Sequence, residues 1–335
     1  MGLQAPPFDA PPQLFADWLE LKASVTDQRK VWLVDIERAW EATRESEDTD
    51  FEGAEKEFNE WLRPVLACIQ RRALILDSAY PFQLDDNGDT LSYIGVLDDT
   101  HVGQAVYMLC LILSSIPESE IVDKARLKIP NSTRDRFQAC SAWAAAAVIG
   151  GCAYAFGWPR PDGSDFMTAL GIVYHDSMGD KEATVRDEPP PGASGAEKDG
   201  GIDIVAWRPR VDHASGKVYL LGQVATGKNW KDKPVAADIK PLHDNWFVFS
   251  PVSRPIPAMF IPYSIIPENG ATVEDQLRFL TSRFGVVIYR DVLPRYAQEG
   301  FEAGTAKLAQ VHRLQDFASI KKYVERVLKL LGGPK

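Results

Sequence analysis

The segment 198–207 reads KDGGIDIVAW and the segment 222–230 reads GQVATGKNW, and these two stretches decide the fold. Residues 202–207 and 217–224 are runs of β-branched, aromatic and other apolar side chains. Residues 212–216 between them have the composition of a turn. Such a pattern predicts two strands of a β-hairpin. Residues 187–201, rich in Pro, Gly and Ser, predict a linker before the hairpin.

Helical and strand-like patterns alternate on both sides of this hairpin. We expect helices over 235–245, 273–284 and 314–331, and strands over 258–261 and 286–289. Before the linker, a helix capped by Ser132 or Thr133, with Asp135 in its first turn, is expected to run to about residue 156. Gly150-Gly151 is expected to bend this helix, and 166–175 to form another. The alternation predicts an α/β fold over residues 132–335.

Residues 1–131 form a second, mostly helical region. Helical patterns cover 12–72, including 31–40, and an apolar helix is expected over 106–116. Short apolar runs flank Asp86-Asn87-Gly88-Asp89, where the Asn-Gly pair predicts a hairpin turn. The acidic stretch 45–60 is interpreted as the solvated end of one helix and the start of the next.

The net charge of −10 is distributed unevenly. Residues 1–130 carry 12 Lys/Arg and 24 Asp/Glu (−12), whereas residues 131–335 carry 25 and 23 (+2). These numbers exclude binding of duplex DNA by general positive charge and leave room for local contacts in the second region. We expect the acidic region to face a partner protein or another copy of the chain.

Composition also bears on compartment and on metals. The four cysteines form no CxxC pair and the five histidines are scattered, which argues against structural zinc and favours free thiols in a reducing compartment. No signal-peptide pattern is present at the N-terminus. The uncharged stretch 137–159 is built mainly of small residues, so we interpret it as buried helix and not as a membrane span. We therefore expect a cytoplasmic protein without membrane contact.

The hairpin carries the candidate chemistry. Two adjacent strands can place Asp203 and Gln223 side by side, where a carboxylate and an amide oxygen can hold Mg²⁺ or Mn²⁺. An Asp within an apolar strand is unfavourable without a partner, which favours a functional role for Asp203. The ammonium of Lys228 can orient or deprotonate an attacking water.

These residues resemble the PD-(D/E)XK, or restriction-endonuclease-like, superfamily, and most of all its Mrr-like branch, whose strands read GxD and then QxK. The resemblance covers about residues 134–262. It implies a mixed sheet flanked by helices and a Mg²⁺-dependent endonuclease that hydrolyses DNA phosphodiester bonds. Asp203 matches the metal-binding Asp, Gln223 the acidic position, and Gln138 the place where the first core helix often brings a Glu. The pattern GIDIVAW…GQVATGKNW is also similar to uncharacterised bacterial proteins associated with phage defence, which implies partner defence proteins.

Two positions depart from the superfamily pattern. Ala225 stands where the catalytic Lys is expected, so Lys228 is the candidate substitute, and Gln138 replaces Glu. Asp199 is then the candidate second carboxylate for the metal. Two hypotheses stay open: an active endonuclease, and an inactive nuclease-fold module that binds nucleic acid or a partner protein.

A third hypothesis is a nucleotide-binding P-loop, because residues 222–228 fit GxxxxGK after a strand. Asn229 lacks the hydroxyl that would bind Mg²⁺, and Pro234 interrupts the helix that should follow.

Basic residues around the hairpin are candidates for phosphate contacts. We predict nucleic-acid binding by Arg208, Arg210, Lys231 and Lys233, in a neighbourhood that also holds Lys217 and Lys240. Trp230 and Trp246 are interpreted either as base-stacking residues, if exposed, or as core.

Overall fold

The computed structural model describes residues 3–42, 51–116, 121–122, 129–179, 182–193, 197–212, 214–233 and 235–332, without the side chains of 51, 52, 54 and 228. The chain forms two compact units. One comprises Met1–Ile129 with Ser319–Lys335, and the other Pro130–Ala318. The sequence interpretation placed the C-terminal helix with the second region, whereas most of it belongs to the first unit. An amphipathic helix is held by the apolar surface it covers, whatever its distance along the chain.

The first unit is mainly helical and contains a small sheet. Its sheet has the strand order β1-β3-β2, with antiparallel pairs, and β2–β3 is the hairpin predicted around the Asn-Gly turn. Its elements are α1 (Pro12–Val25), β1 (Lys30–Trp32), α2 (Leu33–Glu41), α3 (Phe51–Leu76), η1 (Asp77–Ala79), β2 (Phe82–Leu84), β3 (Thr90–Tyr93), α4 (Val102–Ser115) and, from Ser319, α10 (Phe317–Gly332).

One prediction in this unit is wrong. The helical pattern over 31–40 begins as a strand, because Lys30, Val31 and Trp32 pair with Ser92, Leu91 and Thr90 of β3. Val31 and Leu91 are both buried. Strand pairing and burial here outweigh the local helical periodicity.

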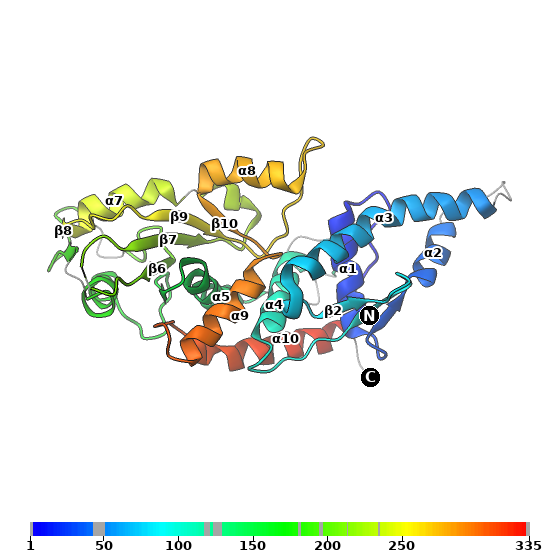
Figure 1. Cartoon of the computed structure of the whole chain (residues 1–335), viewed down its shortest axis with the longest axis horizontal. Helices are drawn as coiled ribbons and strands as arrows, with labels where there is room; N and C mark the ends of the chain where they lie inside the picture. Colours follow the sequence, from blue (N-terminus) through cyan, green and yellow to red (C-terminus); the bar gives the residue numbers. More distant parts are fainter. Residues whose placement is uncertain are drawn as a thin grey trace. The chain divides into compact units, whose positions relative to one another are not determined.

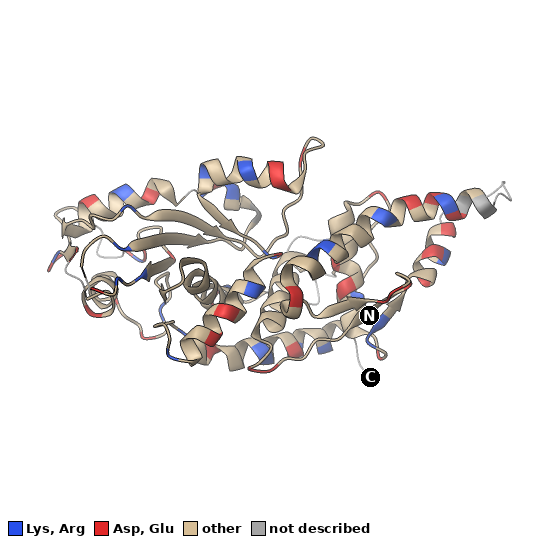
Figure 2. Ribbon diagram, in the orientation of Figure 1, with Lys and Arg blue, Asp and Glu red and all other residues tan. Residues whose placement is uncertain are grey.

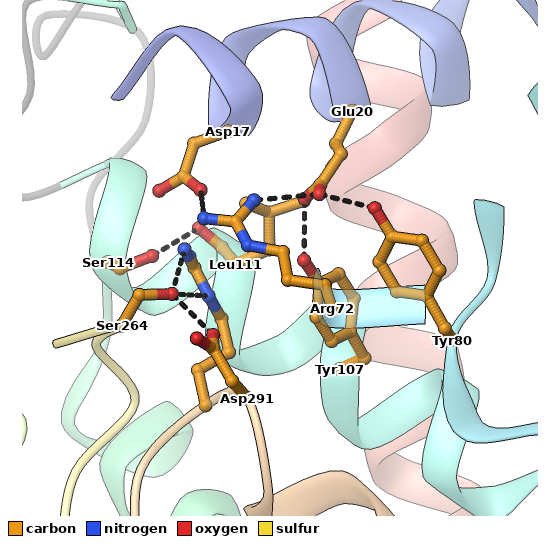
Figure 3. A network of polar contacts seen from close by, with 10 residues as sticks. Asp17, Glu20, Arg72, Tyr80, Tyr107, Leu111, Ser114, Ser264 and Asp291 are labelled. Atoms are coloured by element: carbon orange, nitrogen blue, oxygen red, sulfur yellow. Dashed lines mark hydrogen bonds and ion pairs between the residues drawn. The ribbon is translucent and has the colours of Figure 1, made fainter. Parts of the chain in front are cut away.

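A buried polar network joins the helices of this unit (Figure 3). The guanidinium of Arg72 on α3 donates to Glu20 Oε1 and to Asp17 Oδ1, both on α1 and both at 2.7 Å. Tyr80 and Tyr107 donate their hydroxyl protons to the two carboxylate oxygens of Glu20, each at 2.7 Å. Charges so far from water are tolerated only when paired and hydrogen-bonded, so this network fixes α1 against α3 and α4.

Acidic side chains gather on α2 and on the first half of α3 (Figure 2). Burial and the neighbouring carboxylates of Glu41 and Glu55 raise the pKa of Glu37. The predicted acidic stretch 45–60 overlaps this part of α3, and its residues up to 50 lie outside the described part of the chain.

The second unit is an α/β structure (Figure 1). Its elements are α5 (Asn131–Ile149), β4 (Cys152–Ala155), α6 (Phe166–Gly171), the π-helical turn η2 (Ile172–Ser177), β5 (Thr184–Val185), β6 (Ile204–Arg208), β7 (Val218–Val224), η3 (Lys228–Asp232), α7 (Ala236–Trp246), β8 (Phe247–Phe249), β9 (Ile256–Phe260), α8 (Val273–Phe284), β10 (Val286–Ile288), α9 (Leu293–Thr305) and η4 (Leu314–Asp316).

Its main sheet is mixed and has five strands in the order β10-β9-β7-β6-β4. The predicted hairpin forms as expected: β6 and β7 are antiparallel, with Ile204 opposite Gly222. β4 adds antiparallel to β6, and β9 and β10 add parallel beyond β7. Helices α7 and α8 supply the two crossovers that parallel strands require.

Helices cover both faces of this sheet (Figure 1). One face packs on α6 and α7 through a cluster that includes Val205, Leu221, Phe166 and Trp246. Nearer β10, the same face packs on α8 through Met259, Ile261, Leu280 and Phe284. Helix α5 packs on β4, β6 and β7 and is covered in turn by α9. The result is a sheet between two helical layers.

The helix predicted from Ser132 or Thr133 to about residue 156 is too long at its C-terminal end. Helix α5 ends at Ile149, because Gly150 adopts a left-handed conformation (φ 63°) that terminates helices. A Cβ on Gly151 would lie 2.3 Å from the carbonyl oxygen of Trp207, so glycine lets the chain turn tightly into β4.

The predicted cap of α5 is also wrong. The N-cap is Pro130, without a side-chain cap, and Asp135 pairs with Arg313 at 2.7 Å.

The helices predicted over 235–245 and 273–284 correspond to α7 and α8, and the strands predicted over 258–261 and 286–289 correspond to β9 and β10. Within the described part of the chain, no helix combines the length and the apolar character needed to cross a membrane.

Candidate functional site

Asp203 lies directly before β6 and is held by backbone groups of two neighbouring elements. Its N–H donates to Gly222 O at 2.9 Å, and its Oδ2 accepts the N–H of Val224 at 2.8 Å. Its carbonyl oxygen accepts the N–H groups of Phe156 and Gly157 at 2.7 and 3.0 Å. Residues 156–157, Asp203 and the end of β7 therefore form one rigid corner of the unit.

Gln138 reaches the same corner from α5. Its Nε2 lies 3.4 Å from Asp203 O. A Cβ on Gly157 would stand 2.2 Å from Asp203 Oδ1 and 2.7 Å from Gln138 Nε2. Glycine at 157 thus leaves room for both polar side chains at one point.

Gln223 lies opposite Asp203 when the β6–β7 register is continued by one residue beyond the Ile204–Gly222 pair. Residues directly opposite in an antiparallel pair project from the same face, so the two side chains share a face of the sheet. Gln223 Oε1 is buried and has no hydrogen-bond partner among the described residues. A buried amide oxygen without a partner is costly, and a cation or a ligand donor would satisfy it.

Asp203 and Gln223 lie between two apolar clusters of the sheet. On the same face, Val205 and Leu221 belong to the cluster under α6 and α7. Ala225 and Met259 belong to the separate cluster under α8. Asp203 and Gln223 therefore interrupt the apolar face where its two clusters meet.

The electrostatics of the corner are those of a crowded acidic site. Burial raises the pKa of Asp203 to about 7, Asp199 adds to the rise, and the Val224 N–H and the charge of Lys233 oppose it. Burial and the charge of Asp199 also raise the pKa of Asp238 on α7. Asp199 accepts hydrogen bonds from Gly201 N at 3.0 Å and Trp158 N at 3.4 Å.

The predicted basic residues separate into two groups along the hairpin. Arg208 ends β6, about 17 Å along the strand from Asp203 at ~3.3 Å per residue. Arg210 follows it and pairs with Asp212 at 2.6 Å. Neither residue is brought to the Asp203 corner.

Lys231 and Lys233, by contrast, follow the end of β7 where Gln223 lies. Lys231 pairs with Glu268 at 2.5 Å. Lys233 is exposed, makes no ion pair with a described residue, and is the lysine whose charge acts on Asp203.

Two further lysines of the neighbourhood are also paired. Lys217 is buried against Glu182 at 3.0 Å, so the expectation that it belongs to a basic surface is wrong. Lys240 on α7 pairs with Asp244 of the same helix.

The structure leaves the assignment of Lys228 as a prediction. Its backbone begins η3, and its side chain lies outside the described residues. At the expected lysine position, Ala225 is buried in the cluster beneath α8 with Trp230 and Met259. A lysine there would place its ammonium in an apolar environment, which explains why Ala suits this backbone.

The geometry around 222–228 argues against a phosphate-binding loop. Gly222 lies inside β7, paired with Ile204 and Ala258, and does not begin a loop. The segment from Lys228 is a short 3-10 turn and not an α-helix whose N-terminus could face a phosphate.

Trp230 and Trp246 are both core residues. Trp230 packs against Phe284 and Trp246 against Phe166, at centroid distances of 5.2 and 4.7 Å. Neither is available for stacking on a base.

Sequence reasoning missed three residues of this corner: Gly157, Trp158 and Asp238. Sequence analysis did not single out Gly157, because the helix from Ser132 or Thr133 was predicted to extend to about residue 156. Gly157-Trp158-Pro159 comes one residue after the apolar strand β4, a break that marks a turn. Asp238 offered no local pattern, because only tertiary packing brings α7 beside Gly201.

The donor set fits a hard divalent cation. It consists of oxygens only: the Asp203 carboxylate, the Asp199 carboxylate and the Gln223 amide oxygen, to which no described residue donates a hydrogen bond. Among the described residues, no group of three or more His, Cys, Asp or Glu side chains is arranged to hold a metal ion. A metal at this corner therefore depends on the amide oxygen of Gln223.

A scan against protein-family models, a search of curated proteins and a search of solved structures each gave no match to this chain.

Proposed function

We propose that the second unit is a Mg²⁺-dependent endonuclease that hydrolyses phosphodiester bonds of DNA in the cytoplasm. The observation that carries the proposal is the polar pair Asp203–Gln223 at the junction of two apolar clusters, in which the buried amide oxygen has no hydrogen-bond partner within the described part of the chain. A buried carboxylate with a raised pKa lowers the free energy of unfolding at neutral pH, because the folded protein disfavours its charge. Groups kept at such a cost concentrate at functional sites.

The resemblance to the PD-(D/E)XK superfamily supports the same function. It implies a metal-binding Asp at 203, a second ligand at 223 and a contribution from the first core helix at 138. A mixed sheet between helices, with Asp203, Gln223 and Gln138 at one corner, is consistent with these expectations. The similarity to phage-defence proteins suggests the same setting for this chain.

Each residue has a role in the proposed reaction. Asp203 and Gln223, helped by Asp199, would hold Mg²⁺ or Mn²⁺, and Gln138 positions the backbone of Asp203. When bound, the cation supplies a Lewis acid at the phosphoryl oxygen and lowers the pKa of water. The water oxygen bonds to phosphorus, the bond to one sugar oxygen breaks, and the displaced proton passes to that leaving oxygen.

Lys233 is the residue that we place beside the reacting phosphate. It is exposed, makes no ion pair with a described residue, and carries charge close enough to act on Asp203. In this position it offsets the developing negative charge. Lys228 remains the second candidate for this role, following the sequence prediction.

A second candidate function is a module that keeps the nuclease fold and binds nucleic acid or a partner protein without cleaving. Ala225, buried at the lysine position, favours it. The acidic first unit, with its carboxylates on α2 and α3, is proposed as the surface for a basic partner protein or another copy of the chain.

The decisive experiment is a plasmid-nicking assay on the full chain with Mg²⁺ or Mn²⁺, combined with Mn²⁺ binding measured by electron paramagnetic resonance. Asp203→Ala should reduce nicking at least ~100-fold, as loss of a group that stabilises the transition state does. Asp212→Ala, an exposed Asp at the far end of the hairpin, is the matched control and should cleave normally. Equal nicking by wild type and Asp203→Ala would overturn the assignment. Absence of nicking by the wild type, with Mn²⁺ binding that depends on Asp203, would favour the binding module.

A further inference from the structure

Trp158 is exposed and follows Gly157 in the turn whose backbone bonds to Asp203 and Asp199. Its residue is 43% exposed, whereas the other tryptophans of the second unit, Trp143, Trp207, Trp230 and Trp246, are buried. Large apolar rings left in water at a candidate site commonly serve a ligand.

Backbone hydrogen bonds tie the turn that carries Trp158 to Asp199 and Asp203. The N–H of Trp158 donates to Asp199 Oδ2 at 3.4 Å. The two residues before it, Phe156 and Gly157, donate to Asp203 O at 2.7 and 3.0 Å. The indole therefore starts from a turn anchored to Asp199 and Asp203.

The guanidinium of Arg160 lies near the Trp158 ring. Its guanidinium carbon lies 5.8 Å from the Trp158 ring centroid and 4.8 Å from that of Phe156. The guanidinium is fixed by donation to Ser164 O at 3.1 Å and to Lys198 O at 2.6 Å, and Arg160 is only 5% exposed. The fixed guanidinium thus offers the indole a cation–π contact.

The charges of the corner determine which ligand suits it. Asp199, Asp203 and Asp238 are acidic, and only Lys233, of the four predicted phosphate-binding residues, is both near the corner and without an ion pair to a described residue. Neutralisation of phosphate charge by this one lysine therefore gives a nucleic acid little affinity for the corner. Stacking on the apolar face of a base must supply the rest.

We propose that Trp158 stacks on an unpaired base next to the phosphate held at the Asp203 site, so that the preferred substrate is single-stranded or locally unpaired DNA. This inference rests on the proposed function for the position of the phosphate. Bases in a continuous duplex are stacked on each other and offer no free face, whereas every base of a single strand does.

The test measures binding of a fluorescent single-stranded oligonucleotide by anisotropy, without metal, to the full chain. Trp158→Ala should lose ~5- to 150-fold in affinity, the range for one base–aromatic stack. Trp158→Phe, which keeps a ring, should retain most of it and also controls for misfolding. Trp32→Ala removes the exposed tryptophan of the first unit and should bind as the wild type does. Wild type should bind the strand more tightly than the matching duplex or an abasic strand.

The outcomes separate this inference from the nuclease assignment. Equal binding by wild type and Trp158→Ala, or equal binding of intact and abasic strands, overturns the stacking role even if Asp203-dependent cleavage is found. Weakened binding by Trp158→Ala with retention by Trp158→Phe supports it even if the chain cleaves nothing.

Discussion

The carboxylate of Asp203 accepts the backbone N–H of Val224 at 2.8 Å, and this bond fixes the metal candidate to the strand that carries Gln223. The bond favours the charged carboxylate, but burial outweighs it and raises the pKa of Asp203 to about 7. Burial and this hydrogen bond act in opposite directions on the pKa of Asp203, so a change in either of them shifts that pKa.

Asp203→Asn should stabilise the protein above pH 7. The unfolded chain releases the Asp203 proton near pH 3.8, whereas the folded protein keeps it to about pH 7. The free energy of unfolding therefore falls as pH rises through this window, and Asn escapes the penalty because it is uncharged. We expect a gain of roughly 2–4 kcal/mol at pH 8 that vanishes near pH 4, measured by urea unfolding. A loss of similar size at both pH values would contradict the raised pKa.

Glu182→Gln should destabilise the protein at neutral pH. Burial opposes the charge of Glu182, but hydrogen bonds from Ser253, Lys217 and Gly216 N outweigh it and hold its pKa at about 2. The variant removes the carboxylate that lies 3.0 Å from the buried ammonium of Lys217, and breaking such a buried pair costs roughly 3–5 kcal/mol. Because a lowered pKa stabilises above the unfolded value, this difference should shrink as pH falls from about 4.5 to 2.

The matched control for Glu182 is the exposed pair of Arg210 and Asp212. Asp212→Asn should leave the free energy of unfolding almost unchanged, since water screens the pair. Equal effects of the two substitutions in acid and urea unfolding would show that the Glu182 pair is not buried in solution.

Gly157→Ala should disturb the candidate site directly. Its Cβ would lie 2.2 Å from Asp203 Oδ1 and 2.7 Å from Gln138 Nε2, so one of these side chains must move. We expect weakened Mn²⁺ binding together with a loss of ~1–3 kcal/mol in stability, as for other overpacked sites. Gly171→Ala is the control, because nothing lies within 4 Å of its Cβ. It should leave Mn²⁺ binding unchanged, and a loss of binding in both variants would speak against a local effect.

Arg72→Met should destabilise the first unit by roughly 3–5 kcal/mol, since it leaves the carboxylates of Asp17 and Glu20 without their buried cation. Tyr80→Phe removes only one donor to Glu20 and should cost about 1 kcal/mol. Hydrogen exchange of α1 and α3 measures both effects. Slower or unchanged exchange in Arg72→Met would show that the network does not hold these helices together.

Local sequence patterns predicted much of the second unit. Two apolar runs separated by a turn-like segment predicted the antiparallel pair β6–β7, and helical patterns predicted the helices after it, because these elements are specified by neighbouring residues. The same hairpin indicated that Asp203 and Gln223 lie side by side, since antiparallel register follows from two adjacent strands.

Sequence analysis missed the features that depend on contacts between segments far apart along the chain. β1 was read as helix because its partner β3 lies some 60 residues away in sequence, and β4 was read as helix because Ala-rich strands show no period. Lys217 was read as a surface cation because its partner Glu182 is remote in the sequence. The proximity of Gly157 and Trp158 to Asp203 and Asp199, and of Asp238 to Gly201, had no local pattern.

The sequence by itself determined the α/β class of the second unit, its hairpin, the uneven charge and the residues Asp203 and Gln223. These depend on periodicity and composition, which short stretches carry. Only the tertiary structure decided that Gln223 Oε1 has no hydrogen-bond partner among the described residues, that Asp203 is buried enough to raise its pKa, and that Trp158, in the turn bonded to Asp203, is exposed. Burial and unsatisfied hydrogen bonds are properties of the whole packed unit, because they depend on which distant atoms exclude water from each group.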